Sequence, residues 1–341
     1  IQDIENMIVT ASKKLLSKGI TSVQSDDFCV ISQKNYQKVL DAYFALNKDK
    51  KLPIRVYEQC LLPKIDLLKE FLNKGYTTGY GDEFFKIGPL KLLGDGSLGG
   101  RTAYLSKPYN DDPSTCGIAL YTQEELDELV LTAHNAGMGV AIHAIGDKMM
   151  YMAFESIEKA QISNPRKNPR HAIIHCQITD KKLLDRFKEL NVIAHIQPIF
   201  LDYDIHIVEK RLGKDRAKTT YNWKSLFNRG VHVACGSDCP VEEADVLHGI
   251  YSAITRKDLK GYPKNGWLPE QRLSLHEAIY GFTLGAAYAS FEENIKGSIE
   301  PNKLADMVVL SENVYKMPED NIKDIEIEMT FVNGKLLYAK S

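Results

Sequence analysis

The chain has 341 residues, 44% of them hydrophobic, and its 43 basic residues nearly balance 45 acidic ones. The length suits one large domain and a small second one. The balanced charge excludes the basic field typical of nucleic-acid binding, and six cysteines are too few for a disulfide scaffold. No apolar stretch approaches the roughly 20 residues of a membrane-spanning helix. We therefore expect a cytoplasmic protein that acts on a small molecule, without nucleic acid or membrane as a partner.

Helical and strand patterns alternate along most of the chain. Apolar residues at helical spacing predict a first helix over 4–16, and Gly19 ends it before a strand at 20–23. Further helices are expected at 33–46, 64–73, 124–136, 148–160, 181–190, 223–229 and 273–290. Further strands are expected at 54–59, 90–93, 139–143, 172–175, 192–195 and 231–235. Strands that alternate with helices favour a parallel sheet covered by helices.

About seven strands are predicted, one fewer than the eight that close a (β/α)8 TIM-type barrel of the α/β class. We expect residues 1–294 to form this barrel from its strands two to eight, with the first strand upstream of Ile1. The tail differs, because Asn333-Gly334 between apolar runs predicts a β-hairpin. Residues 295–341 are expected to form the C-terminal part of a small β domain of the sandwich type.

Polar side chains stand at the ends of several apolar runs. Two runs end in His143 and His175, and a third, over 231–235, leads into Gly236-Ser237-Asp238. The carboxyl ends of parallel barrel strands meet at one face, which is where such barrels carry catalytic groups. Imidazole and carboxylate are ligands for Zn, Fe, Ni or Mn, and a carboxylate can also take a proton from a metal-bound water. We predict a metal site here, with Asp238 as catalytic acid/base.

Lys91 lies inside an apolar run, where desolvation favours the neutral amine. A neutral lysine can react with carbon dioxide to give a carbamate that bridges two metals; the alternative is a lysine whose head reaches solvent. The glycine-rich stretch 95–101 lacks the ending of a phosphate-binding loop and is interpreted as a substrate-facing loop. For Arg101 in this stretch, a solvated surface position is the alternative. The substrate-binding side chains that we predict are Asp95, Arg101, His195 and Gln197.

Several of these segments resemble the amidohydrolase superfamily, in the branch of the N-substituted formamide deformylases. The segments that carry the resemblance are 94–103, 143–147, His175, Gln197-Pro198, 236–241 and 297–310. The resemblance implies that His143 and His175 are metal ligands from the fifth and sixth barrel strands, and that Asp238 is the acid/base after the eighth. It makes Lys91, after the fourth strand, a candidate carboxylated ligand. It also implies one or two divalent metals, with zinc expected and iron, manganese or nickel as alternatives.

One family feature does not occur in this chain. The first barrel strand of the family carries two histidines separated by one residue, and none of the nine histidines here has another two positions away. That pair would lie upstream of Ile1, so we expect the chain to be a fragment. An upstream polypeptide segment or a second copy of the chain is then expected to complete the barrel, because open strand edges are a liability.

The activity that the resemblance implies is hydrolysis of carbon-nitrogen bonds other than peptide bonds, in an amide, formamide or cyclic amide. A metal-activated hydroxide would attack the carbonyl carbon, and Asp238 would pass the proton to the departing nitrogen. An alternative is a catalytically inactive barrel that serves as a scaffold or awaits a partner segment. A third interpretation, a lyase or aldolase that uses Lys91 as a Schiff base, leaves both histidines unexplained.

Overall fold

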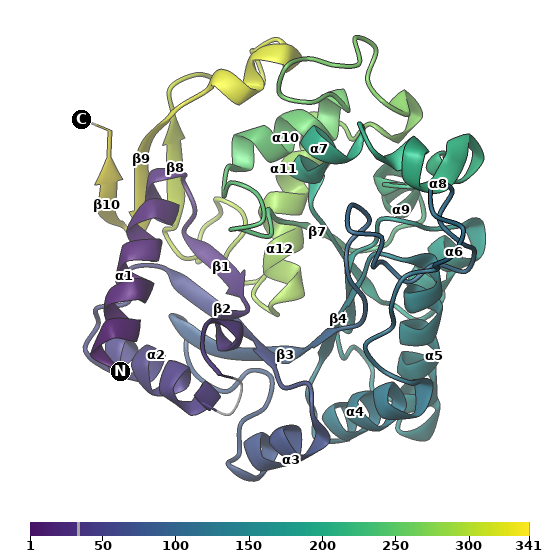
Figure 1. Ribbon diagram of the computed structural model, residues 1–341. Coiled ribbons are helices and arrows are strands. Elements are labelled where there is room, and N and C mark those ends of the chain that lie inside the picture. Colours follow the sequence, from purple (N-terminus) through teal and green to yellow (C-terminus); the bar gives the residue numbers. More distant parts are fainter. Residues whose placement is uncertain (33–34, 341) are drawn as a thin grey trace.

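The computed structural model describes residues 1–32 and 35–340 of the chain. A parallel sheet of seven strands curls through the molecule in the order β1-β2-β3-β4-β5-β6-β7, and helices cover its convex face (Figure 1). The strands are β1 (Ser22–Ser25), β2 (Arg55–Leu61), β3 (Phe85–Leu93), β4 (Val140–Ala144), β5 (Ala172–His175), β6 (Ile193–Ile196) and β7 (Val233–Cys235). The prediction of a TIM-type fold with seven strands in chain order is confirmed.

The helices follow the predicted alternation, with several additions after β6 and β7. The α-helices are α1 (Gln2–Ser17), α2 (Tyr36–Lys48), α3 (Ile65–Asn73), α4 (Gln123–Asn135), α5 (Asp147–Ser163), α6 (Lys181–Glu189), α7 (Leu201–Asp204), α8 (Val208–Ala217), α9 (Trp223–Asn228), α10 (Val246–Thr255), α11 (Leu275–Phe282) and α12 (Leu284–Ala289). The predicted start of the second helix, at Gln33 and Lys34, lies outside the described residues. Within the described part of the chain, no helix has the length and apolar character needed to cross a membrane.

The register of the sheet decides which side chains share its concave face. Leu93 of β3 pairs with His143 of β4, and Ile174 of β5 pairs with both His143 and His195. Paired residues of neighbouring strands point to the same side, and side chains alternate along a strand. Lys91, two residues before Leu93, therefore shares the concave face with His143 and His195.

Helix α12 lies inside the curl of the sheet, in the opening between β7 and β1 (Figure 1). Gln24 of β1 donates a hydrogen bond of 3.0 Å to the carbonyl oxygen of Ala286. Ala289 of α12 packs with small and branched residues of the concave face. These residues are Ala141, Ala172, Ile174, Ile193 and Ala234. The helix thus fills part of the space that β1 and β7 leave between them.

The prediction of one helix over 273–290 is wrong, because the chain breaks at Thr283 into α11 and α12. Thr283 has φ −124° and ψ −93°, far from helical values. Two glycines on either side allow the close approach that causes the break. A Cβ on Gly281 would lie 2.4 Å from Cys235 Sγ, and a Cβ on Gly285 would lie 2.3 Å from the carbonyl oxygen of Val233. Packing on β7 therefore overrides local helix propensity.

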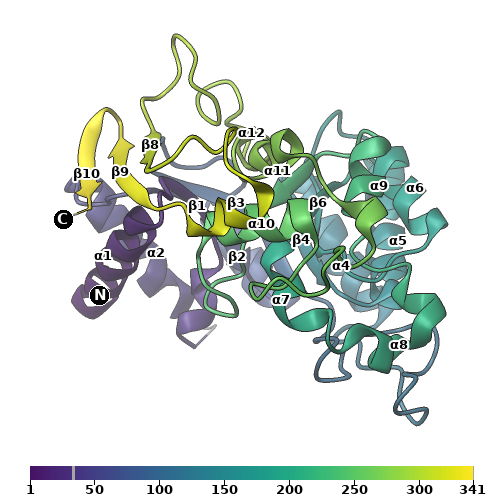
Figure 2. The same cartoon turned by 90° about the horizontal axis from the view of Figure 1, so that it is seen from above.

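A small antiparallel sheet stands beside α1, on the side of the molecule away from α6 and α8 (Figure 2). Its strands, in the order β10-β9-β8, are β8 (Met307–Leu310), β9 (Ile327–Val332) and β10 (Lys335–Ala339). Asn333 and Gly334 connect β9 and β10 with φ of 51° and 73°, which confirms the predicted hairpin. A buried ion pair of 2.6 Å joins Arg55 of β2 to Asp306 before β8. The domain boundary at 294/295 stays a prediction, and Ser341 lies outside the described residues.

Two buried histidines form a hydrogen-bonded chain at the amino-terminal end of β4. His171 Nδ1 accepts the backbone N–H of Val140 at 3.1 Å, so its Nε2 carries the proton that faces His134 Nδ1 at 2.9 Å. His134 Nε2 then donates to the carbonyl oxygen of Asn164 at 2.7 Å. Burial lowers the pKa of both rings, that of His171 to about 3. Both histidines are therefore neutral in the folded protein at neutral pH.

The neutral histidine pair predicts a loss of stability in mild acid. Above the unfolded pKa of about 6.5 its contribution is complete. Below that pH, unfolding takes up protons that the folded rings do not accept, so the free energy of unfolding falls as the pH drops toward the folded pKa of His171. Changing His171 to Asn keeps an acceptor for Val140 and removes one such group. We expect urea unfolding at pH 6 to 4 to show a pH slope smaller by up to about 1.4 kcal/mol per pH unit. The exposed His276→Asn is the control, and equal slopes in native and His171→Asn protein would contradict the assignment.

The contact of α12 with β7 predicts a strong effect of a single methyl group. Gly285→Ala places its Cβ against the backbone carbonyl of Val233 and should lower the free energy of unfolding by about 1–3 kcal/mol. Gly99→Ala is the matched control, because its Cβ would meet only Ile207 at an ordinary 3.5 Å. Denaturant unfolding of both variants checks this, and equal stabilities would mean that α12 does not pack on β7 as described.

Candidate active site

Asp95, two residues after β3, ties together the backbone around the strand ends. It is 3% exposed, and its carboxylate accepts the N–H groups of Ile145 at 3.0 Å, Gly146 at 2.8 Å and Tyr104 at 2.9 Å. Its Oδ1 also lies 3.2 Å from His143 Nε2. Charge-assisted hydrogen bonds of this kind fix a carboxylate firmly. The structure therefore places Asp95 beside His143. The predicted contact of Asp95 with substrate stays a prediction.

His143 lies near the end of β4 with a defined proton position. Its Nε2 is 3.1 Å from the carbonyl oxygen of Gly96, and its side chain is 15% exposed. A carbonyl oxygen only accepts, so we assign the proton to Nε2. In this tautomer the lone pair belongs to Nδ1.

His175 ends β5, and its ring is oriented by Gln197 after β6. The backbone turns into the left-handed region there, with φ of 80° at His175 and 52° at Cys176. His175 Nδ1 is 2.8 Å from Gln197 Oε1, so Nδ1 donates and Nε2 keeps the lone pair. Burial, followed by the charges of His143 and Lys91, lowers the pKa of His175 well below its usual value. The ring centroids of His143 and His175 are 4.3 Å apart.

Lys91 and two further predicted residues belong to the same electrostatic neighbourhood. Lys91 is 6% exposed on the concave face. Burial lowers the pKa of His195 to about 4, and the charge of Lys91 adds to the effect. Burial raises the pKa of Asp238, while the charges of Lys91 and His143 oppose the rise. Asp238 follows β7 in the left-handed region, with φ of 60°. The ends of β3, β4, β5, β6 and β7 thus meet at one place.

Asp26, directly after β1, belongs to this neighbourhood and was not predicted. Burial raises its pKa to about 6; Lys91 opposes the rise, and the carboxylates of Asp27 and Asp238 add to it. The signal was present in the sequence, because Asp26 follows a predicted strand as Asp238 does. It was missed because Asp26-Asp27 also has the composition of an ordinary turn.

Arg101 is held by an ion pair within the loop that follows β3. Its guanidinium contacts Asp111 through two bonds, Nε to Oδ1 at 3.1 Å and Nη2 to Oδ2 at 2.8 Å. Arg211 of α8 binds the same carboxylate and donates to the carbonyl oxygen of Gly99 at 2.9 and 3.2 Å. Arg211 therefore anchors the loop to α8, and Arg101 is tied to Asp111 within the loop. The predicted role of Arg101 in substrate binding stays a prediction.

The proton positions of the two histidines at the strand ends are compatible with binding of a divalent metal. Carbonyl or amide oxygens take the protonated nitrogen of each ring, so His143 Nδ1 and His175 Nε2 keep lone pairs, as metal-ligating histidines require. In the described part of the chain, no group of three or more His, Cys, Asp or Glu side chains is already arranged to hold a metal. Lysine is not among these types, and Lys91 is the predicted additional ligand.

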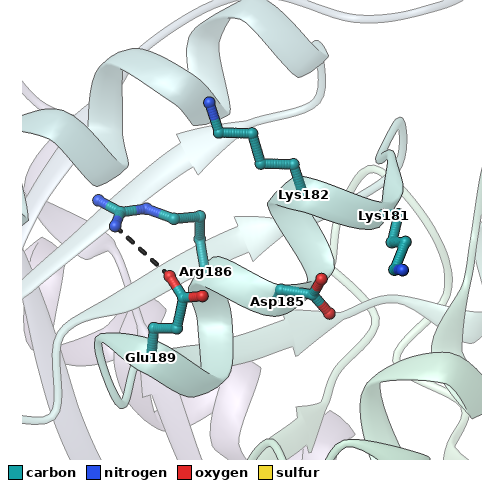
Figure 3. A pocket seen from close by; sticks show the side chains of 5 residues that line it. All are labelled: Lys181, Lys182, Asp185, Arg186 and Glu189. Carbon is teal, nitrogen blue, oxygen red and sulfur yellow. Dashed lines mark ion pairs between the residues drawn. The ribbon is translucent and has the colours of Figure 1, made fainter.

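A surface hollow elsewhere in the molecule has no relation to this site. It measures about 390 Å³ and is lined only by charged residues of α6, on the convex side of the sheet (Figure 3). They are Lys181, Lys182, Asp185, Arg186 and Glu189. Arg186 and Glu189 pair at 3.5 Å across it. All the side chains that line the hollow are charged and come from one face of α6. This is the composition of an ordinary solvated helix surface.

The curled parallel sheet with imidazoles, a lysine and a carboxylate at its strand ends defines the class of metal-dependent hydrolase barrels. The chain belongs to the amidohydrolase family, whose model matches residues 1–338. The chain is 35% identical over 341 residues to the protein YtcJ of Bacillus subtilis (strain 168), which is named as an amidohydrolase. It is 22% identical over 228 residues to the N-substituted formamide deformylase of Arthrobacter pascens.

Among solved structures, the chain resembles an uncharacterized metal-dependent hydrolase from Pyrococcus furiosus. The TM-score is 0.74 and the identity 30%, over 89% of this chain and 58% of that one. The YtcJ match covers 99% of this chain and 62% of YtcJ, and the deformylase match covers 66% of this chain and 41% of that enzyme. The chain thus spans about three fifths of the length of YtcJ.

The hydrogen bond from His175 to Gln197 predicts a dependence of metal affinity on residue 197. Gln197→Ala removes the acceptor that orients the ring and should weaken zinc binding by about 10- to 100-fold. Gln197→Glu keeps an acceptor at this place and should bind zinc within a few-fold of the native protein. Competition titration with a chromophoric chelator measures both affinities. Equal loss in the two variants would show that the acceptor does not matter.

Proposed function

We propose that the chain carries the catalytic barrel of a metal-dependent hydrolase that cleaves carbon-nitrogen bonds other than peptide bonds, in an amide, formamide or cyclic amide. The observation that carries the proposal is the pair of imidazoles, His143 and His175, whose Nε2 and Nδ1 face the oxygens of Gly96 and Gln197 and whose ring centroids are 4.3 Å apart. Family membership and the name of the deformylase relative support the bond type.

His143, His175 and Lys91 are the proposed metal-holding side chains, with Asp238 at the same centre. When bound, a divalent metal such as zinc would supply an activated water and polarise the substrate carbonyl. Asp238 accepts the proton of the attacking water and delivers it to the departing nitrogen. A pKa raised by burial suits this exchange, because a carboxylate with a higher pKa is a stronger base.

Lys91 is the proposed site of carboxylation. Its burial at 6% exposure favours loss of the ammonium charge, and an amine without that charge reacts with carbon dioxide. Asp26 interacts electrostatically with Lys91 and Asp238, and we propose that its carboxylate holds the lysine ammonium or a water molecule at this centre. His195 and Gln197 border the same space, and we propose that they face the substrate.

The proposal extends to the substrate, the compartment, the domain boundary and the completion of the barrel. The substrate is a small molecule and the compartment is the cytoplasm. The three strands β8, β9 and β10 belong to a small β domain that starts near residue 295. A second copy or an upstream segment would complete the barrel between β1 and β7, where α12 now lies.

The proposed role of Asp238 is tested by Asp238→Asn. Asparagine keeps the size of the side chain but cannot carry a proton between water and nitrogen. We expect kcat for a panel of N-formyl and N-acyl amines to fall by about 10²- to 10⁴-fold, while zinc content measured by mass spectrometry stays close to that of the native protein. An Asp238→Asn protein that keeps native kcat would rule out this role. A native protein that binds zinc and turns over no amide would favour the inactive scaffold.

A further inference from the structure

Two arginines, Arg256 and Arg272, lie near the carboxyl end of α10, and Arg256 packs against the rings of two tryptophans. Arg256 ends α10 in the left-handed region with φ of 58°, and it is 0% exposed. Its Cζ lies 4.5 Å from the ring centroid of Trp223 and 5.2 Å from that of Trp267. Among the described residues, neither Arg256 nor Arg272 forms an ion pair with an Asp or Glu. This region shares no residue with the proposed metal site.

The hydrogen bonds of Arg256 leave one of its nitrogens unused. Nε donates to the carbonyl oxygen of Trp267 at 2.9 Å, and Nη1 donates to that of Tyr221 at 2.9 Å. Nη2 is buried and has no hydrogen-bond partner within the described part of the chain. Burial lowers the pKa of Arg256 to about 9, so the guanidinium keeps its charge at neutral pH.

The other unsatisfied groups around Arg256 are donors as well. Within residues 1–32 and 35–340, Trp223 Nε1 and Arg272 Nε are also buried without a partner. Arg272 is near, because a Cβ on Gly266 would lie 2.3 Å from the carbonyl oxygen of Thr255 and 2.9 Å from Arg272 Nη2. Arg256 Nη2, Trp223 Nε1 and Arg272 Nε are therefore three buried N–H donors that no acceptor takes within the described part of the chain. The other contact of Arg272 is satisfied, because its Nη2 donates to the carbonyl oxygen of Asn265 at 2.7 Å.

The nearest acidic groups do not neutralise this charge. Asp204 accepts the hydroxyl of Tyr221, and Glu270 is exposed and acts on Arg256 only at a distance. A buried charge without a counter-charge destabilises the folded protein, and the contacts with the two indole rings offset only part of that cost. A donor-only region with excess positive charge is chemically complementary to an anion.

We propose that this region binds a small monovalent anion of the chloride type, held by Arg256 Nη2 with help from Trp223 Nε1 and Arg272 Nε. The anion supplies the missing acceptor and counter-charge, and it joins the end of α10 to α9 and to the 265–272 loop. It acts on stability, because it binds the folded arrangement of three segments that separate on unfolding.

The test compares thermal unfolding of the native protein in sodium chloride and sodium gluconate at equal ionic strength. We expect the midpoint in chloride to be higher by about 2–4 °C. In Trp223→Phe, which keeps a ring but loses the indole N–H, the chloride concentration for half of this effect should rise about tenfold. Arg186→Lys, which changes an arginine paired with Glu158, is the control and should keep the native response.

A second measurement does not depend on any variant. Crystals of the native protein soaked in bromide should give an anomalous peak within hydrogen-bonding distance of Arg256 Nη2. Equal midpoints in the two salts would overturn the proposal. So would a water molecule or a carboxylate side chain at the position of the expected peak.

Discussion

Parallel pairing of neighbouring strands is the constraint on which the proposed site depends. Parallel strands need a crossover connection, so the carboxyl ends of β1 to β7 all lie at the same edge of the sheet. The register then sets which side chains share the concave face, and it places His143 beside Leu93 and Ile174 beside His195. A slip of one residue would turn His143 into the layer between sheet and helices. The convergence of Lys91, His143, His195 and Asp238 is therefore a property of the sheet.

Acceptors around the two imidazoles add a second level of order. The carbonyl oxygen of Gly96 accepts the N–H of His143, and Gln197 Oε1 accepts that of His175. Asp95 binds the backbone N–H groups of the turn that follows His143. The rings are therefore oriented in the protein without a metal, which would lower the entropic cost of the proposed metal binding. Burial keeps His175 neutral, so binding need not displace a proton from it. The region of Arg256 differs from this site, because it offers hydrogen-bond donors and positive charge where the metal site offers lone pairs.

The strand-end residues could be predicted from sequence because short apolar runs are a local signal. The apolar run that ends in His175 coincides with β5 residue for residue. Asn333-Gly334 predicted the hairpin because two-residue hairpin turns need positive φ angles, which Asn and Gly adopt easily. Long-range contacts carried no such signal. The break at Thr283 depends on Gly281 and Gly285 meeting β7, about 50 residues away in the chain.

The same limit applies within the candidate site. Arg101 could be named from the glycine-rich loop, but its ion pair with Asp111, whose carboxylate Arg211 also binds, depends on how that loop folds against α8. The hydrogen bonds of Asp95 to the turn after β4 likewise join segments 50 residues apart. Sequence gives the identities of such residues, and only the packed structure gives their partners.

The most direct measurement on this molecule is the position of a bound metal. Diffraction data from crystals of the zinc-loaded protein, collected on both sides of the zinc absorption edge, locate the ion independently of any assumed chemistry. A single anomalous site, or a closely spaced pair, within coordination distance of His143 Nδ1 and His175 Nε2 is the expected result. Zinc bound only elsewhere on the chain would contradict the convergence of the strand ends into a metal centre.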